Sequence, residues 1–130
     1  MKFGSVTAVA VVAVALAIVG CASGNTGGLE TKLAPIHELD IRFAESFPVQ
    51  VFLYIKGGLA DGCTKFHGIE IKSRSNNSIR VEATVERPKD AVCPAIYTFF
   101  EQNLNLGSDF KSGETYTVTV NDKRTSFTMP

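Results

Sequence analysis

The cysteines are the residues of this 130-residue chain whose types and spacing could do the clearest chemistry. Cys63 and Cys93 form an even pair that can close a disulfide in an oxidising compartment. Zinc is the alternative, because Cys63-Thr-Lys-Phe-His67 places an imidazole close after a thiol. Structural zinc sites use four ligands, and no fourth residue completes this set. If the protein is exported, the pair therefore favours a disulfide without a metal.

Cys21, the third cysteine, indicates the compartment. Met1-Lys2 gives a positive start, residues 6–19 form an uncharged aliphatic run, and Ile18-Val19-Gly20-Cys21 closes that run. This arrangement resembles the lipobox of bacterial lipoproteins. The resemblance implies that residues 1–20 are a signal peptide and that Cys21 becomes an acylated amino terminus. The covalent lipid on Cys21 is then the only cofactor that we expect.

A transmembrane anchor is the rival interpretation of the aliphatic run. As a helix, residues 6–19 would span about 21 Å, which is shorter than the hydrocarbon core of about 30 Å. The length suits a signal peptide. Two or more acyl chains hold a protein firmly, so a triacylated Cys21 would fix it to the membrane surface.

Residues 21–35 are expected to be the lipidated cysteine and a flexible tether, and residues 36–130 a single folded domain. Ala22, rather than Asp, follows the lipidated position. By resemblance to lipoprotein sorting, this implies the outer membrane in a bacterium with two membranes and the cell surface otherwise. Without residues 1–20 the chain has 12 Lys and Arg (13 less Lys2) and 13 Asp and Glu, a net charge of −1. Such a balance predicts no nucleic-acid partner.

The folded part alternates apolar and polar residues almost throughout, which is typical of half-buried strands. We expect seven strands, at about residues 39–43, 48–56, 66–73, 79–86, 95–106, 116–120 and 125–129. Residues 95–106 alternate irregularly, which predicts a bulge. Seven short strands without a helix favour an all-β, antiparallel, immunoglobulin-like sandwich, with a small closed β-barrel as the alternative.

Two resemblances support this fold. The segment Gly113-x-x-Tyr116-Thr-Val-Thr-Val120-Asn121 resembles the final hairpin of bacterial immunoglobulin-like surface domains, in which such a tyrosine pins a corner through its hydroxyl. Glu45-Ser-Phe-Pro-Val-Gln-Val51, Gly58-Leu-Ala-Asp-Gly-Cys-Thr64 and Arg87-Pro-x-x-Ala-Val-Cys93 are similar to a group of uncharacterised envelope proteins. That similarity implies a fold and a location and no activity.

Catalytic patterns are weak, so we expect the protein not to be an enzyme. No Gly-x-Ser-x-Gly motif is present, and a disulfide would leave Cys63 and Cys93 unable to attack a substrate. His67 shares strand parity with Ile69 and Ile71, which predicts a place at the edge of the core face. Glu82 and Glu86 alternate with a basic residue as on a solvated strand face.

Two surfaces are candidates for binding. Lys65 and Arg87 lie in or beside loops that the disulfide would staple together, although such charges often only solvate loops. Phe52 and Tyr54 lie opposite the apolar face of their strand, although loops or cross-strand pairs can cover such aromatics. We therefore expect a lipid-anchored binding or structural module of the cell envelope, with an unknown protein partner. A protease inhibitor that presents the stapled loops is the alternative.

Overall fold

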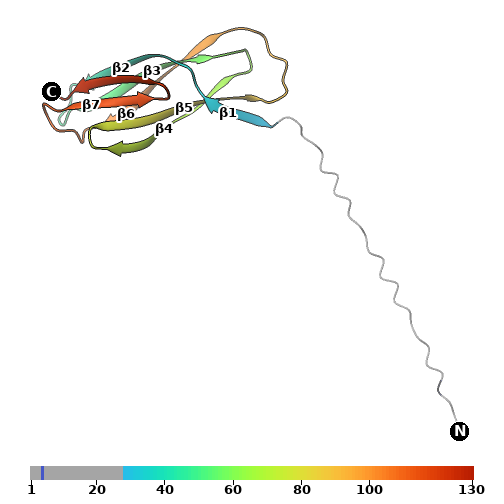
Figure 1. Ribbon diagram of the computed structural model, residues 1–130, viewed down its shortest axis with the longest axis horizontal. Helices are drawn as coiled ribbons and strands as arrows, with labels where there is room; N and C mark the ends of the chain where they lie inside the picture. The colour runs from blue at the N-terminus through green and yellow to red at the C-terminus, as the bar shows by residue number, and fades with distance from the viewer. Residues whose placement is uncertain (1–3, 5–27) are drawn as a thin grey trace.

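The computed structural model describes Gly4 and residues 28–130 (Figure 1). Apart from Gly4, the expected signal peptide lies outside the described residues, as do Cys21 and the tether up to residue 27. The described part of the chain contains strands, turns and loops but no helix. Accordingly, none of its elements is a helix long and apolar enough to cross a membrane.

Eight strands make up the described part of the fold. They are β1 (Leu29–Leu33), β2 (Ile36–Ala44), β3 (Gln50–Leu59), β4 (Lys65–Ser75), β5 (Ser78–Pro88), β6 (Thr98–Gly107), β7 (Thr115–Val120) and β8 (Lys123–Thr128). Strands β2 to β8 correspond to the seven that the alternation predicts.

Strand β1 corrects the expected extent of the tether, because residues 29–33 belong to the folded domain. This strand pairs antiparallel with β5, from Leu29 opposite Pro88 to Leu33 opposite Thr84. Four of its five residues are exposed, so the strand is held by backbone pairing rather than by burial. Only the next residue, Ala34, enters the core.

The strands form two sheets, which Figure 1 shows lying one over the other. In the five-stranded sheet, β4 pairs with one edge of β5, β1 and β7 pair with β5 as well, and β8 pairs with β7. The three-stranded sheet has the order β2-β3-β6. The predicted sandwich is thus confirmed and the closed barrel is wrong. One pair departs from the expected antiparallel pattern, since β5 and β7 run parallel.

The core lies between the sheets and follows the alternation of the strands. In β3, Val51, Leu53 and Ile55 are fully buried while Phe52 and Tyr54 lie on the other side. The facing sheet contributes buried apolar residues from β5 and β7: Ile79, Val81, Ala83, Val85, Tyr116, Val118 and Val120. A sheet with one buried face fixes its pairing register, because a slip of one residue would turn this set outward.

The pairing register shifts once between β2 and β3, once between β3 and β6, and twice between β4 and β5. Between β3 and β6, Val51 opposes Gly107 and Phe52 opposes Asn105, so Leu106 is the extra residue, and it is buried. A bulge thus lies within residues 95–106 as predicted, but at their end; the irregular alternation at residues 95–97 has another cause, since these residues precede β6. The register of β4 and β5 also shifts between Phe66 and Gly68, around His67.

The hairpin of β7 and β8 is pinned at both ends. The backbone N–H of Lys111 donates to the hydroxyl of Tyr116 at 2.8 Å, which confirms the predicted corner pin. At the β7–β8 turn, Asn121 adopts a φ of 53°. Its side-chain amide donates to the carbonyls of Ala34 (2.7 Å) and Ala83 (2.9 Å), and its oxygen accepts from the Ala83 N–H (3.1 Å). Asn121 therefore bridges β5 to the segment that follows β1.

Candidate functional site

A disulfide joins two loops at the end of the sandwich where β1 begins. Cys63, between β3 and β4, is bonded to Cys93, between β5 and β6, with their Cα atoms 5.6 Å apart. The Gly62 N–H also donates to the Pro94 carbonyl at 2.9 Å. The predicted disulfide is confirmed. We call residues 60–65 and 89–97 together the stapled end.

Asp61 organises the first of these loops. Its Oδ1 accepts from the backbone N–H of Cys63 (3.0 Å) and from the N–H (2.9 Å) and hydroxyl (2.8 Å) of Thr64. The pKa of Asp61 is lowered below its ordinary value. The hydrogen bond from the Thr64 hydroxyl contributes most, followed by the Cys63 N–H, the Arg87 charge and the Thr64 N–H, while partial burial opposes the shift. The carboxylate therefore stays ionised near neutral pH and holds the turn.

Arg87 stiffens the stapled end from inside. Its Nε lies 3.1 Å from Asp61 Oδ2, although the N–H does not point at that oxygen and the pair is ionic rather than hydrogen-bonded. One terminal nitrogen reaches the Ala91 carbonyl and the Cys93 sulfur, both at 3.3 Å. Only 20% of the side chain is exposed. The structure thus places Arg87 in a supporting position, whereas Lys65 is exposed at the start of β4.

A small pocket opens beside this ion pair. It has a volume of about 280 Å³ and is lined by Lys32, Leu33, Pro35, Gly58, Ala60, Asp61, Thr64, Val85 and Arg87. Two of its charged residues, Asp61 and Arg87, form an ion pair at 3.1 Å. The pocket therefore offers no unpaired charge from this pair for an ionic ligand.

In the described part of the chain, the stapled end contains the one group of three potential metal-ligating side chains that lie close together. Ligand atoms of Asp61, Cys63 and Cys93 lie within 4.8 Å of one another. Because the two sulfurs are bonded to each other, neither is a free thiolate, the form that binds zinc. His67, the third member of the possible zinc set, instead contacts Thr84 and Glu86.

His67 lies on the outer face of the five-stranded sheet, contrary to the expected place at the edge of the core. The bulge around it reverses the parity, so that Ile69 and Ile71 remain partly buried while His67 is exposed. Its Nδ1 lies 2.9 Å from the Thr84 hydroxyl, and its Nε2 lies 3.8 Å from a Glu86 oxygen. The hydroxyl, imidazole and carboxylate are near one another, but 3.8 Å exceeds a hydrogen bond and Thr84 can also donate to the Gly68 carbonyl. The group does not form a nucleophile–base–acid relay.

Phe52 and Tyr54 lie half-buried on the outer face of the three-stranded sheet. The Arg42 guanidinium lies 4.6 Å from the centre of the Tyr54 ring, and the Tyr54 hydroxyl donates to Glu101. This hydrogen bond to a carboxylate is the main reason that the pKa of Tyr54 is raised to about 12. Outward residues of β2 and β6, which pair with β3, lie around these two aromatics. We call this surface the β3 outer face and define it as Asp40, Arg42, Phe52, Tyr54, Glu101, Asn103 and Asn105.

An aromatic cluster for which the sequence pattern gives no direct indication covers the end of the same sheet. The rings of His37, Tyr97 and Phe99 meet edge to face, with centroids 5.2–5.7 Å apart, and His37 Nε2 is hydrogen-bonded to the Tyr97 hydroxyl. A Cβ atom on Gly58 would overlap the Tyr97 hydroxyl. The strand expected at residues 48–56 stops before Gly57 and Gly58, whereas both glycines lie within β3. A glycine inside a strand is the signal for such a close approach.

Comparison with known proteins gives a family and no activity. The ORF11 beta-sandwich domain matches residues 53–129. An uncharacterised 10.2 kDa protein in the HgiCIIM 5′ region of Herpetosiphon aurantiacus is 41% identical over 87 residues, which are 67% of this chain and 90% of that protein. The similar protein in the HgiBIM 5′ region is 40% identical over 77 residues, or 59% of this chain and 92% of the relative. No solved structure matches. Because the matched segment exceeds half of the sequence, the chain belongs to the ORF11 beta-sandwich domain family.

Proposed function

We propose that this protein is a non-enzymatic binding or structural module of the bacterial cell envelope, held at a membrane by a lipid on Cys21. The observation that carries the proposal is the sequence Ile18-Val19-Gly20-Cys21 behind an aliphatic run. The site of action would be the outer membrane in a bacterium with two membranes and the cell surface in one with a single membrane.

The folded domain supports export. Its one disulfide, Cys63–Cys93, belongs to the class of bond that persists outside the reducing cytosol. Among the described residues, the one imidazole with both a hydroxyl and a carboxylate nearby, His67, lacks the geometry of a catalytic relay. We therefore favour a module that acts by contact.

The β3 outer face is the surface that we propose for the partner. Phe52 and Tyr54 place aromatic area beside the Arg42 guanidinium, and aromatic and arginine side chains are enriched at protein interfaces. The protease-inhibitor alternative relies on the stapled end. That end lies where the chain enters the domain from the side of Cys21, because the Lys89 N–H donates to the Gly28 carbonyl at 2.9 Å. In an anchored protein these loops would face lipid rather than a protease, so we favour the sheet face.

Lipidation can be tested on the mature protein. Mass spectrometry of its amino-terminal peptide should find Cys21 as the first residue, carrying a diacylglycerol. The Cys21→Ala variant should retain residues 1–20 and lack the lipid, because its thiol cannot be modified. A Cys63→Ala/Cys93→Ala variant is the matched control, since it loses thiols but should be acylated. A mature form that begins elsewhere without lipid would contradict the anchor.

The partner surface can be tested separately. The double change Phe52→Ala and Tyr54→Ala should reduce crosslinked partner recovery from intact cells tenfold or more, as expected when aromatic anchors are removed. Because both side chains are only half-buried, the free energy of unfolding should fall by roughly 1–3 kcal/mol, less than for core residues. Arg80→Ala, on the exposed face of β5, should leave recovery unchanged. Equal recovery from all three folded proteins would exclude the β3 outer face.

A further inference from the structure

We propose that the stapled end seats in the lipid surface itself, with Val92 and Ile96 entering the boundary between head groups and acyl chains. The proposal rests on the lipid anchor proposed above. It concerns a different contact, since the anchor acts through Cys21 and the seat acts through side chains of the folded domain.

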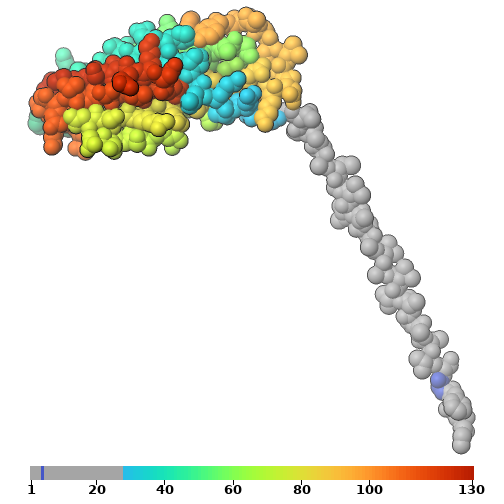
Figure 2. Space-filling view, viewed as in Figure 1, coloured from blue at the N-terminus to red at the C-terminus, as the bar shows by residue number. Residues whose placement is uncertain are grey.

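The position of the chain entry is the first argument. Figure 2 shows β1 and the loop between β5 and β6 together at one end of the domain, and Leu29 pairs there with Pro88. Only the seven residues 22–28 separate Cys21 from Leu29, and fully extended they span at most about 25 Å. Strand β3, with ten residues, adds about 33 Å between the two ends of the sandwich. The stapled end is therefore the nearest part of the domain to the lipid on Cys21.

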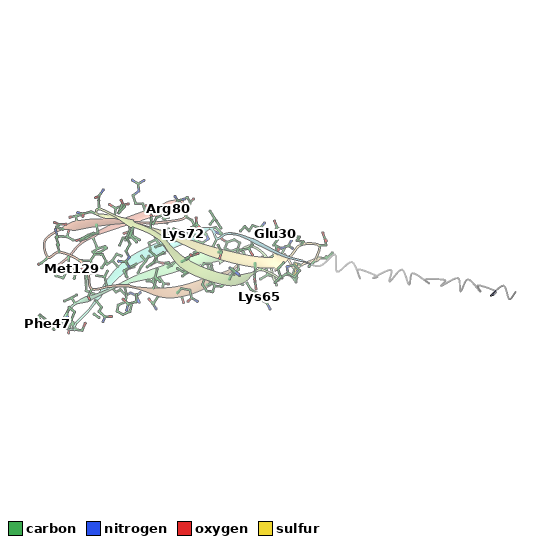
Figure 3. The ribbon with its side chains drawn as sticks, turned by 90° about the horizontal axis from the view of Figure 1, so that it is seen from below. Glu30, Phe47, Lys65, Lys72, Arg80 and Met129 are labelled. Carbon is green, nitrogen blue, oxygen red and sulfur yellow. A yellow bond between two sulfur atoms is a disulfide. The ribbon has the colours of Figure 1, made fainter. Side chains whose placement is uncertain are left out.

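The apolar character of this end is the second argument. The exposed fractions are 100% for Val92, 60% for Leu29, 57% for Ile96 and 47% for Tyr97. Apolar side chains gathered at one exposed end mark an interaction surface, and a tyrosine ring is typical of the membrane–water interface. Phe47, which is also fully exposed, lies at the other end, as Figure 3 shows with Glu30 and Lys65 toward the chain entry.

The balanced charges at the stapled end favour a hydrophobic contact with lipid rather than an electrostatic one. Lys89 is followed by Asp90 in the stapled end, and Lys65 lies opposite Glu86 in the strand pairing. With these charges balanced, the surface gains little from anionic head groups and depends on apolar burial. Seating should therefore occur on neutral phosphatidylcholine and change little with salt.

Tryptophan fluorescence can test this contact, because the wild-type chain contains no tryptophan. Full-length protein carrying Val92→Trp, Ile96→Trp or Phe47→Trp is purified with its native lipid and reconstituted into phosphatidylcholine vesicles with brominated acyl chains. We expect severalfold stronger quenching at positions 92 and 96 than at position 47. Position 47 is the matched control, since Phe47 is as exposed as Val92 but lies at the opposite end.

The possible outcomes distinguish the contact between the stapled end and lipid, which we call the seat, from the lipid anchor on Cys21. If flotation shows vesicle-bound protein but all three tryptophans are equally unquenched, the anchor stands and the seat is overturned. A concentration-dependent blue shift at position 92 without bromine quenching would show a second copy covering this end, which also overturns the seat. If the protein carries no lipid, the proposed anchor fails. Vesicles added to that protein still decide the seat, which stands if position 92 is quenched and falls if it is not.

Discussion

Removal of the Cys63–Cys93 disulfide should lower the free energy of unfolding by about 3–4 kcal/mol. The bond closes a loop with a sequence separation of 30, and a cross-link of that length restricts the unfolded chain by roughly this amount. Urea unfolding of the wild type and of a Cys63→Ala/Cys93→Ala variant, both with the same amino terminus, measures the difference. The loss is large for a domain of this size, because total stabilities are only about 5–15 kcal/mol.

Lys65→Ala is the matched control for this experiment. Lys65 lies beside the stapled loop but is exposed, so its removal should change stability by no more than about 0.5 kcal/mol. Alkylation gives an independent readout, since both cysteines should react only after reduction. Free thiols in the purified protein together with bound stoichiometric zinc would contradict the disulfide and restore the metal interpretation.

The direction in which side chains point along most strands could be predicted, because burial of one sheet face requires apolar residues at alternate positions. Val51, Leu53 and Ile55 alternate with polar or aromatic neighbours, and a shift of one residue would expose all three. Strand β1 could not be predicted in this way, because only the first and last residues of Leu29–Leu33 are apolar. Four of its five residues remain exposed, and pairing with β5 depends on where the rest of the chain places that strand.

The candidate site was predictable only where its chemistry is intrinsic to the residue type. An even pair of cysteines in an exported chain favours a disulfide wherever the loops lie. The supporting role of Arg87 depends instead on a contact with Asp61, which is distant in sequence. His67 faces outward because one bulge cancels the parity that places Ile69 toward the core. Such contacts arise from the assembled sheets and leave no local pattern.

Asn121→Ala should lower the free energy of unfolding by about 2–4 kcal/mol, a large effect for a partly exposed turn residue. The alternation of β7 and β8 indicates a turn at Asn121 but not its side-chain role. The side chain makes three hydrogen bonds with the backbone of Ala34 and Ala83, and Ala34 and Ala83 are buried. A buried backbone group left without a partner costs about 1–3 kcal/mol. Alanine would also have to adopt a φ of 53°, which adds roughly 1 kcal/mol.

Asn121→Gly separates these two causes, because glycine accepts a positive φ without strain but has no side chain to bridge the strands. We expect the glycine variant to lose about 1–3 kcal/mol and to remain more stable than the alanine variant, as measured by urea unfolding. If the two variants were equally unstable, strain at φ 53° would contribute nothing. If glycine matched the wild type, the side-chain hydrogen bonds would be irrelevant, and the junction of β1, β5 and β7 would be held by strand pairing alone.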